Sequence, residues 1–128
     1  MIHNDVVVEQ ARDVRENAYT PHSGYPVGAA IITPDGALFT GCNIENDSYT
    51  QTLHAEEVAL AKAVSSGYTE FDRLAVSTAG DDVPEPCGHC KQVLTQFCDE
   101  SLTLLLDTGD DENIKYVERD FDPQFKLD

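Results

Sequence analysis

Two short segments of the chain carry side chains that bind metal ions or move protons. Residues 54–56 read His-Ala-Glu, and residues 86–90 read Pro-Cys-Gly-His-Cys. Taken alone, Cys87-x-x-Cys90 fits a redox-active dithiol or half of a structural zinc site. His54 adds an imidazole and Glu56 adds a carboxylate. Together the two segments can supply three metal ligands and one group that carries protons.

Each segment opens a predicted helix, over residues 54–64 and 87–97. A helix N-terminus carries positive partial charge, which favours the thiolate that binds zinc. His54, Cys87 and Cys90 would fill three positions of a tetrahedral Zn²⁺ and leave the fourth for water. Two thiolates, a neutral imidazole and the metal sum to zero charge, so the ion can still activate that water. The pattern therefore predicts a catalytic zinc site.

A structural zinc site is the main alternative, and it needs a fourth protein ligand. The candidates are Cys42, His89 and Cys98. We expect Cys42 and Cys98 to be buried as small apolar groups and His89 to face solvent or a neighbouring subunit. Glu56 is about 200° around a regular helix from His54, so His54 must approach the metal from the looser first turn.

The predicted elements alternate in a way that builds a sheet covered by helices. We expect one domain over residues 1–128, opening with a helix over residues 5–18 whose N-cap is Asn4 or Asp5. A loop over residues 19–26 follows, then a β-hairpin over residues 27–33 and 37–42. Strands at residues 74–78 and 102–106 flank the second metal-binding helix, and residues 114–117 fit a final edge strand. Strand, helix and strand in succession favour an α/β sheet that is at least partly parallel.

The charge balance excludes several classes of partner. The chain has 24 Asp and Glu against 8 Lys and Arg, for a net charge of −16. Nucleic acids and anionic membranes bind clustered Lys and Arg, whereas the cations here are scattered. We expect neither partner, and we expect a halophilic source, because salt screens such repulsion. The chain has no signal-peptide pattern, so its four cysteines indicate a reducing, cytoplasmic compartment.

The H-x-E and P-C-x-x-C segments match the signature of zinc-dependent nucleobase deaminases. The chain resembles the small cytidine deaminases along nearly its whole length, through four further segments. These are residues 16–19 (Glu-Asn-Ala-Tyr), 27–30 (Val-Gly-Ala-Ala), 41–46 (Gly-Cys-Asn-Ile-Glu-Asn) and 90–94 (Cys-Lys-Gln-Val-Leu). The resemblance implies a three-layer α/β/α sandwich with a mixed sheet of about five strands. It also implies a homotetramer that deaminates cytidine or deoxycytidine to the uridine nucleoside and ammonia in pyrimidine salvage.

The same resemblance implies roles for individual residues. Glu56 moves protons between water and the pyrimidine, and Asn43 and Glu45 bind the nucleoside sugar. In the mechanism that we expect, backbone groups near Ala55 and Cys87 orient the ring and the amine. Tyr25 stands where the family usually has Phe beside the pyrimidine, and Phe125 resembles a C-terminal Phe that reaches a neighbouring subunit's site.

One pair of residues departs from the pattern of many short members. Those members have Cys where this chain has His54, and Arg where it has Glu57. With only two thiolates the compensating Arg can be absent, and we expect Glu57 to point away from the zinc. The His variant resembles the longer, dimeric members, so a dimer is the alternative assembly.

Other functions stay open at the level of sequence. The substrate could be another aminopyrimidine nucleoside, such as blasticidin S, although the segment from Asn43 to Asn46 favours cytidine. A polynucleotide cytosine deaminase would need basic residues around its pocket. A non-catalytic module stabilised by zinc is a further alternative. Glu45 could instead cap backbone N–H groups of a loop.

Overall fold

A mixed five-stranded sheet forms the middle of the molecule. The computed structural model describes residues 2–78, 83–109 and 113–124. The strands are β1 (Val27–Ile32), β2 (Leu38–Cys42), β3 (Arg73–Thr78), β4 (Thr103–Asp107) and β5 (Tyr116–Asp120), in the order β2-β1-β3-β4-β5. β3 and β4 run parallel, and the other neighbouring strands run antiparallel. The predicted mixed α/β sheet is confirmed.

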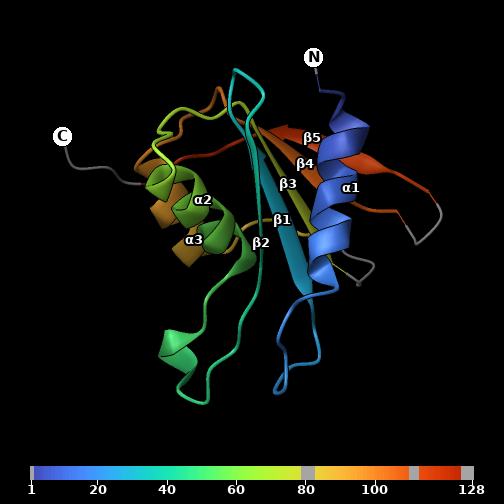
Figure 1. Ribbon diagram of the computed structural model, residues 1–128, viewed down its shortest axis with the longest axis vertical. Helices are drawn as coiled ribbons and strands as arrows, with labels where there is room; N and C mark the ends of the chain where they lie inside the picture. Colours follow the sequence, from blue (N-terminus) through green and yellow to red (C-terminus); the bar gives the residue numbers. More distant parts are fainter. Residues whose placement is uncertain (1, 79–82, 110–112, 125–128) are drawn as a thin grey trace.

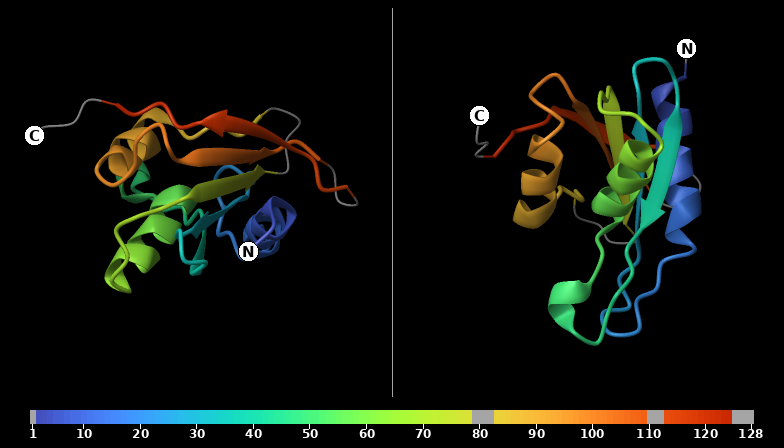
Figure 2. Two further views of the ribbon diagram at one scale, coloured as in Figure 1. Left: turned by 90° about the horizontal axis from the view of Figure 1, so that it is seen from above. Right: turned by 60° about the vertical axis from the view of Figure 1, so that its left-hand side comes forward.

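Helices cover both faces of this sheet. Helix α1 (Asn4–Arg15) packs on one face, and α2 (Ala55–Ser65) and α3 (Gly88–Thr95) pack on the other (Figures 1 and 2). Strand alternation explains the two cores. Ala30 and Ile32 of β1 lie in the cluster under α1, whereas Ala29 and Ile31 lie in the cluster under α2 and α3. The three-layer α/β/α sandwich expected from the sequence is present.

The element boundaries differ from the predictions by a few residues. Helix α1 begins at Asn4 with His3 as its N-cap, not Asn4 or Asp5, because the His3 ring accepts a hydrogen bond from the Asp5 N–H at 3.2 Å. It ends at Arg15 because the chain then turns, and the Tyr19 N–H donates to the Asn43 carbonyl. The final strand begins at Tyr116, two residues later than predicted.

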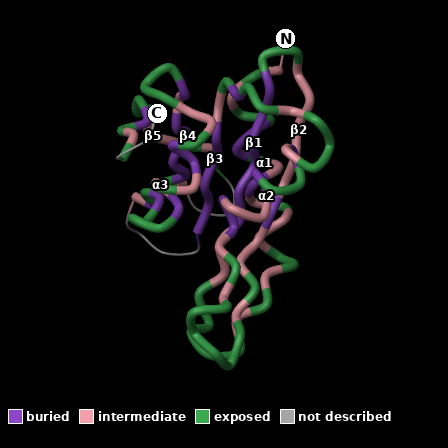
Figure 3. The backbone as a smooth tube through the Cα atoms, turned by 90° about the vertical axis from the view of Figure 1, so that its left-hand side faces the viewer, coloured by how far each residue is buried: buried purple, intermediate pink, exposed green. Residues whose placement is uncertain are grey.

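Two loops extend together beyond one end of the sheet. Residues 19–26 and 43–53, here called the loop lobe, form the mostly exposed lower part of Figure 3. Bridges between Tyr19 and Ile44, and between Ile44 and Leu53, hold them side by side. A short 3₁₀ turn, η1 (Tyr49–Gln51), lies within the lobe. Helix α2 begins directly after the loop lobe, which therefore borders the first metal-binding segment.

A buried ion pair fastens α1 to the sheet. Arg12 donates from Nε and Nη2 to the two carboxylate oxygens of Asp107, each at 2.7 Å. Ser77 donates to the same carboxylate at 2.8 Å, and Arg15 donates to Ser77 at 3.1 Å. The Asp107 side chain is only 1% exposed, so these donors supply the charge and hydrogen bonds that burial requires.

Close packing fixes α2 against β2. A Cβ atom placed on Gly41 would lie 2.5 Å from the Ala59 backbone nitrogen and 2.6 Å from the Ala55 carbonyl oxygen. Only a residue without a side chain therefore lets α2 approach the strand this closely. None of the described helices is long and apolar enough to cross a bilayer.

Candidate active site

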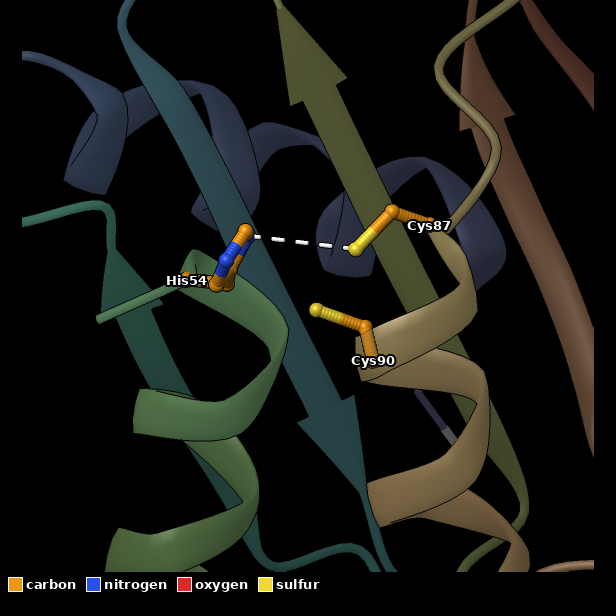
Figure 4. A group of neighbouring side chains, drawn as sticks. All are labelled: His54, Cys87 and Cys90. Carbon is orange, nitrogen blue, oxygen red and sulfur yellow. Dashed lines mark hydrogen bonds between the residues drawn. The ribbon is translucent and has the colours of Figure 1, made fainter. Parts of the chain in front are cut away.

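Three side chains meet at the starts of α2 and α3. One ligand atom from each of His54, Cys87 and Cys90 lies within 4.8 Å of the others, and His54 Nδ1 is 4.0 Å from Cys87 Sγ. Figure 4 shows the three side chains pointing toward one another in front of β1 and β3. The two sequence segments that predict a metal site are thus brought together by the fold.

The helix starts explain how these side chains converge. His54 is the N-cap of α2 and Cys87 is the N-cap of α3, both in extended conformation, while Cys90 lies in the first turn of α3. Because His54 precedes the regular helix, its ring is free of the helical spacing that separates it from Glu56. This confirms that His54 approaches from the helix start.

The donor set fits zinc. Tetrahedral zinc bonds of ordinary length place a nitrogen and a sulfur ligand roughly 3.6 Å apart, a few tenths of an ångström less than the observed separation. Cys90 is fully buried, His54 is half-buried and Cys87 is exposed, so the site is closed on the core side and open on the other. Such an arrangement leaves a coordination position for a small molecule.

A bound cation would change the protonation of the groups around the site. Burial, together with the Glu56 carboxylate and Cys87, raises the pKa of the Cys90 thiol far above its ordinary value. A divalent metal ion reverses this preference, because it binds the thiolate and offsets the surrounding negative charge.

Glu56 lies inside the protein beside these ligands. The residue is 6% exposed and is the second residue of α2. Burial raises the pKa of its carboxyl group, and its own backbone N–H and the Cys90 thiol partly oppose that shift. A carboxyl group that holds its proton more tightly than an exposed one suits general acid and base chemistry.

Glu57 does not point away from the metal ligands, and that prediction is wrong. Its carboxylate accepts a hydrogen bond from the His54 backbone N–H at 2.7 Å and lies 3.1 Å from His89 Nε2. The helical angle from Glu56 directs Glu57 toward the neighbouring α3, which the sequence alone could not place. His89 is exposed, as expected, but it belongs to this arrangement.

The remaining cysteines are not part of the cluster. Cys42 and Cys98 are both half-buried and unpaired, and Cys98 packs against the core under α2 and α3. Burial raises the pKa of the Cys98 thiol to about 12 and also raises the pKa of Cys42. The expected apolar packing is therefore found for Cys98, whereas Cys42 is less buried than expected and lies in neither core cluster.

Asn43 connects the loop lobe to β1. Its Oδ1 accepts from the Val27 N–H at 2.9 Å, and its Nδ2 donates to the Tyr25 carbonyl at 3.0 Å. The Tyr25 residue is 44% exposed. An amide side chain bonded to backbone on both sides holds this part of the lobe in one conformation.

Glu45 caps the neighbouring loop. Its carboxylate accepts from the backbone N–H groups of His22 and Ser23, at 2.8 and 3.1 Å, and from the Ser23 hydroxyl. These hydrogen bonds, chiefly that from Ser23, lower the pKa of Glu45. His22 and Glu45 also line a cavity of about 400 Å³ with Tyr49 and Thr52. The structural role considered from the sequence is therefore present beside an open cavity.

Comparison with known proteins shows the family to which this chain belongs. Residues 1–106 match the family described as the cytidine and deoxycytidylate deaminase zinc-binding region. This chain belongs to that family. A cytidine deaminase of Sporosarcina psychrophila is 43% identical over 100 residues, covering 78% of this chain and 74% of the relative. One of Halalkalibacterium halodurans is 41% identical over 93 residues, covering 73% and 70%.

A solved member of the family has the same fold. The crystal structure of cytidine deaminase from Burkholderia pseudomallei superposes with a TM-score of 0.84 at 35% identity, covering 93% of each chain. The zinc-binding region of the family spans the segments that carry His54, Cys87 and Cys90. The protein is thus a zinc-binding deaminase domain.

Of two further predicted site residues, the structure describes only Ala55. Ala55 is 1% exposed at the first position of α2, where its backbone lies between His54 and Glu56. Phe125 lies outside the described residues. The sequence analysis did not predict the contact between Glu57 and His89. Both residues lie close to proposed metal ligands in sequence, and this proximity could have indicated that they belong to the site.

Proposed function

We propose that this protein catalyses the hydrolytic deamination of cytidine or deoxycytidine to the corresponding uridine nucleoside and ammonia. The convergence of His54, Cys87 and Cys90 beside the buried Glu56 is the observation that carries the proposal. Relatives at 41–43% identity are named cytidine deaminases, which supports the same substrate class. Their coverage includes most of this chain.

The chemistry divides between the metal and Glu56. When bound by the three ligands, zinc supplies Lewis acidity that makes a water molecule nucleophilic near neutral pH. Glu56 accepts a proton from that water and delivers it to N3 of the pyrimidine. A C–O bond forms at C4 and the C–N bond to the amino group breaks. Glu56 transfers the second proton to the departing nitrogen, which leaves as ammonia.

The loop lobe supplies the proposed nucleoside contacts. Asn43 and Glu45 would bind sugar hydroxyls through the donors and lone pairs that their hydrogen bonds within the loop lobe do not use. The backbone at Ala55 would orient the pyrimidine, and Tyr25 would offer its ring face beside it. We assign Phe125 to the same function by resemblance alone, acting in a neighbouring subunit.

Ultraviolet absorbance of cytidine tests this function. Purified protein with a measured zinc content should deplete the cytidine band and release one ammonia per nucleoside. Glu56→Gln should keep its zinc and lose turnover by about 10²–10⁴-fold, the usual contribution of general acid–base catalysis. Near-normal turnover in that variant would reject the role of Glu56. An inactive, zinc-loaded wild type would redirect the search to other aminopyrimidine nucleosides.

The assembly is a further part of the proposal. We infer a homotetramer, with a dimer as the alternative. The loop lobe exposes several large apolar side chains, which supports burial of this surface between subunits. They are Tyr19, Tyr25, Ile44, Tyr49 and Leu53. Light scattering coupled to size-exclusion chromatography should give four times the mass of the 14.1 kDa chain, and a monomer would reject this inference.

The cellular setting follows from the same chemistry. Four unpaired cysteines, two of them proposed zinc ligands, favour a reducing cytoplasm. Conversion of cytidine to uridine there would serve pyrimidine salvage. The net charge of −16 supports a salt-rich source.

A further inference from the structure

The two helices that carry the proposed zinc ligands are joined by a side chain outside the donor set. We propose that Glu57, acting with His89, is a positioning residue that holds the starts of α2 and α3 at the separation that zinc binding needs. The inference rests on the proposed zinc site and assigns a new role within it.

One carboxylate makes both contacts. Glu57 Oε1 accepts from the His54 backbone N–H at 2.7 Å, and Oε2 lies 3.1 Å from His89 Nε2. His54 is itself a proposed ligand, and His89 lies between the ligands Cys87 and Cys90 in sequence. The bridge therefore ties the backbone of one ligand to the short segment that carries the other two.

The surroundings make this bridge a defined contact. The Glu57 side chain is only 19% exposed, whereas the His89 side chain is 56% exposed. The rings of His54 and His89 lie 5.2 Å apart between centroids and are tilted by 35°. His89 thus contacts both the Glu57 carboxylate and the imidazole of His54.

Metal binding depends strongly on this separation. Figure 4 shows that the ligand side chains come from two different helix starts and meet between them. The distance of 4.0 Å between His54 Nδ1 and Cys87 Sγ is already slightly longer than tetrahedral zinc prefers. A further displacement of about 1 Å would loosen the site. A contact that resists helix separation therefore slows the loss of zinc.

Zinc release to a chromogenic chelator, measured without nucleoside, tests the inference. Glu57→Ala should release zinc about tenfold faster than wild type, in the range known for residues that support metal ligands. His89→Ala should also accelerate release. The double variant should be no faster than Glu57→Ala, because both single changes break the same bridge. Glu57→Gln keeps an oxygen that can accept from His54 and should rescue part of the loss.

A matched control separates positioning from general stability. Glu70→Ala changes an exposed glutamate outside the site and should release zinc at the wild-type rate. Thermal unfolding of the metal-free Glu57→Ala variant should show only the modest loss expected from its missing helix-cap bond, too small to populate the unfolded state. Wild-type release from Glu57→Ala, additive effects of the two changes, or acceleration that only follows loss of the metal-free fold would overturn the inference. Because no substrate is present, this outcome is separate from the test of deamination.

Discussion

The proposed proton carrier Glu56 is buried, which is unfavourable for folding. A carboxyl group that is 6% exposed beside the Cys90 thiol has little solvation, so its proton is held more tightly than in water. The sequence predicted its role through the H-x-E pattern. It could not predict the degree of burial, which depends on how α2 packs on β1 and β2. Function and stability therefore oppose one another at this position.

The opposing contributions of Glu56 can be separated in metal-free protein. Its folded-state pKa is raised, so the carboxyl group ionises more easily in the unfolded state. Stability therefore falls as the pH rises above the unfolded-state pKa. Below that pH the group is protonated in both states and contributes nothing. We therefore expect Glu56→Gln to increase the free energy of unfolding at pH 7 and to match wild type at acidic pH. Urea unfolding across pH 4–8 measures this.

The exposed Glu9 provides the control for this comparison. Glu9→Gln should leave the pH dependence of unfolding close to that of wild type. A metal-free Glu56→Gln protein that is less stable than wild type at pH 7 would contradict the view that the buried charge is costly.

At the scale of elements, sequence patterns located the helices and strands but not their contacts. Continuous apolar runs predicted β1 and β3, and the Pro-Asp-Gly turn predicted the hairpin. The end of α1 was predicted too late because Tyr19 bonds to Asn43, which is distant in sequence. The error at Glu57 has the same origin: its partner His89 belongs to another helix. Long-range hydrogen bonds leave no periodic signal in the chain.

The contact between β2 and α2 gives a prediction at this scale. Gly41→Ala places a methyl group against backbone atoms of Ala55 and Ala59, so α2 must move away from the sheet. We expect a loss of about 1–3 kcal/mol in unfolding free energy, typical of overpacking, together with weaker zinc binding. Gly88→Ala is the matched control, because no atom lies within 4 Å of its added Cβ. Equal stabilities of the two variants would refute the close-packing explanation.

The ion pair that attaches α1 to the sheet gives a second prediction at the scale of elements. Arg12→Met leaves the buried Asp107 carboxylate without its bidentate partner, which should cost about 3–5 kcal/mol. Arg119→Met removes a pair with Glu85 whose side chains are 43% and 52% exposed, so it should cost about 0–1 kcal/mol. Chemical denaturation of both variants gives the comparison. A change below about 1 kcal/mol for Arg12→Met would contradict the importance of the buried pair.

At the scale of the molecule, we expect the net charge to influence the conditions in which the fold is stable. A chain of 128 residues with a net charge of −16 repels itself, and concentrated salt shortens the range of that repulsion. This expectation comes from composition alone, because it requires no knowledge of which residues touch. The assembly could be inferred from resemblance only, since a single chain does not reveal which exposed apolar groups meet.

Salt should therefore stabilise the protein. We expect the midpoint of thermal unfolding to rise by several degrees between about 0.05 M and 2 M KCl, because the screening length falls from more than 10 Å to about 3 Å or less. Sucrose at the same osmolarity controls for effects unrelated to charge. An unchanged midpoint in KCl would remove the support for a salt-rich source.

The most direct test of the central claim follows the oxygen atom. Incubation of cytidine with zinc-loaded protein in H₂¹⁸O, followed by mass spectrometry, should give uridine that carries one ¹⁸O from solvent, with ammonia released in equal amount. Glu56→Gln should form almost none. Uridine without ¹⁸O, or equal product from the Glu56→Gln protein, would contradict hydrolysis at this site by Glu56.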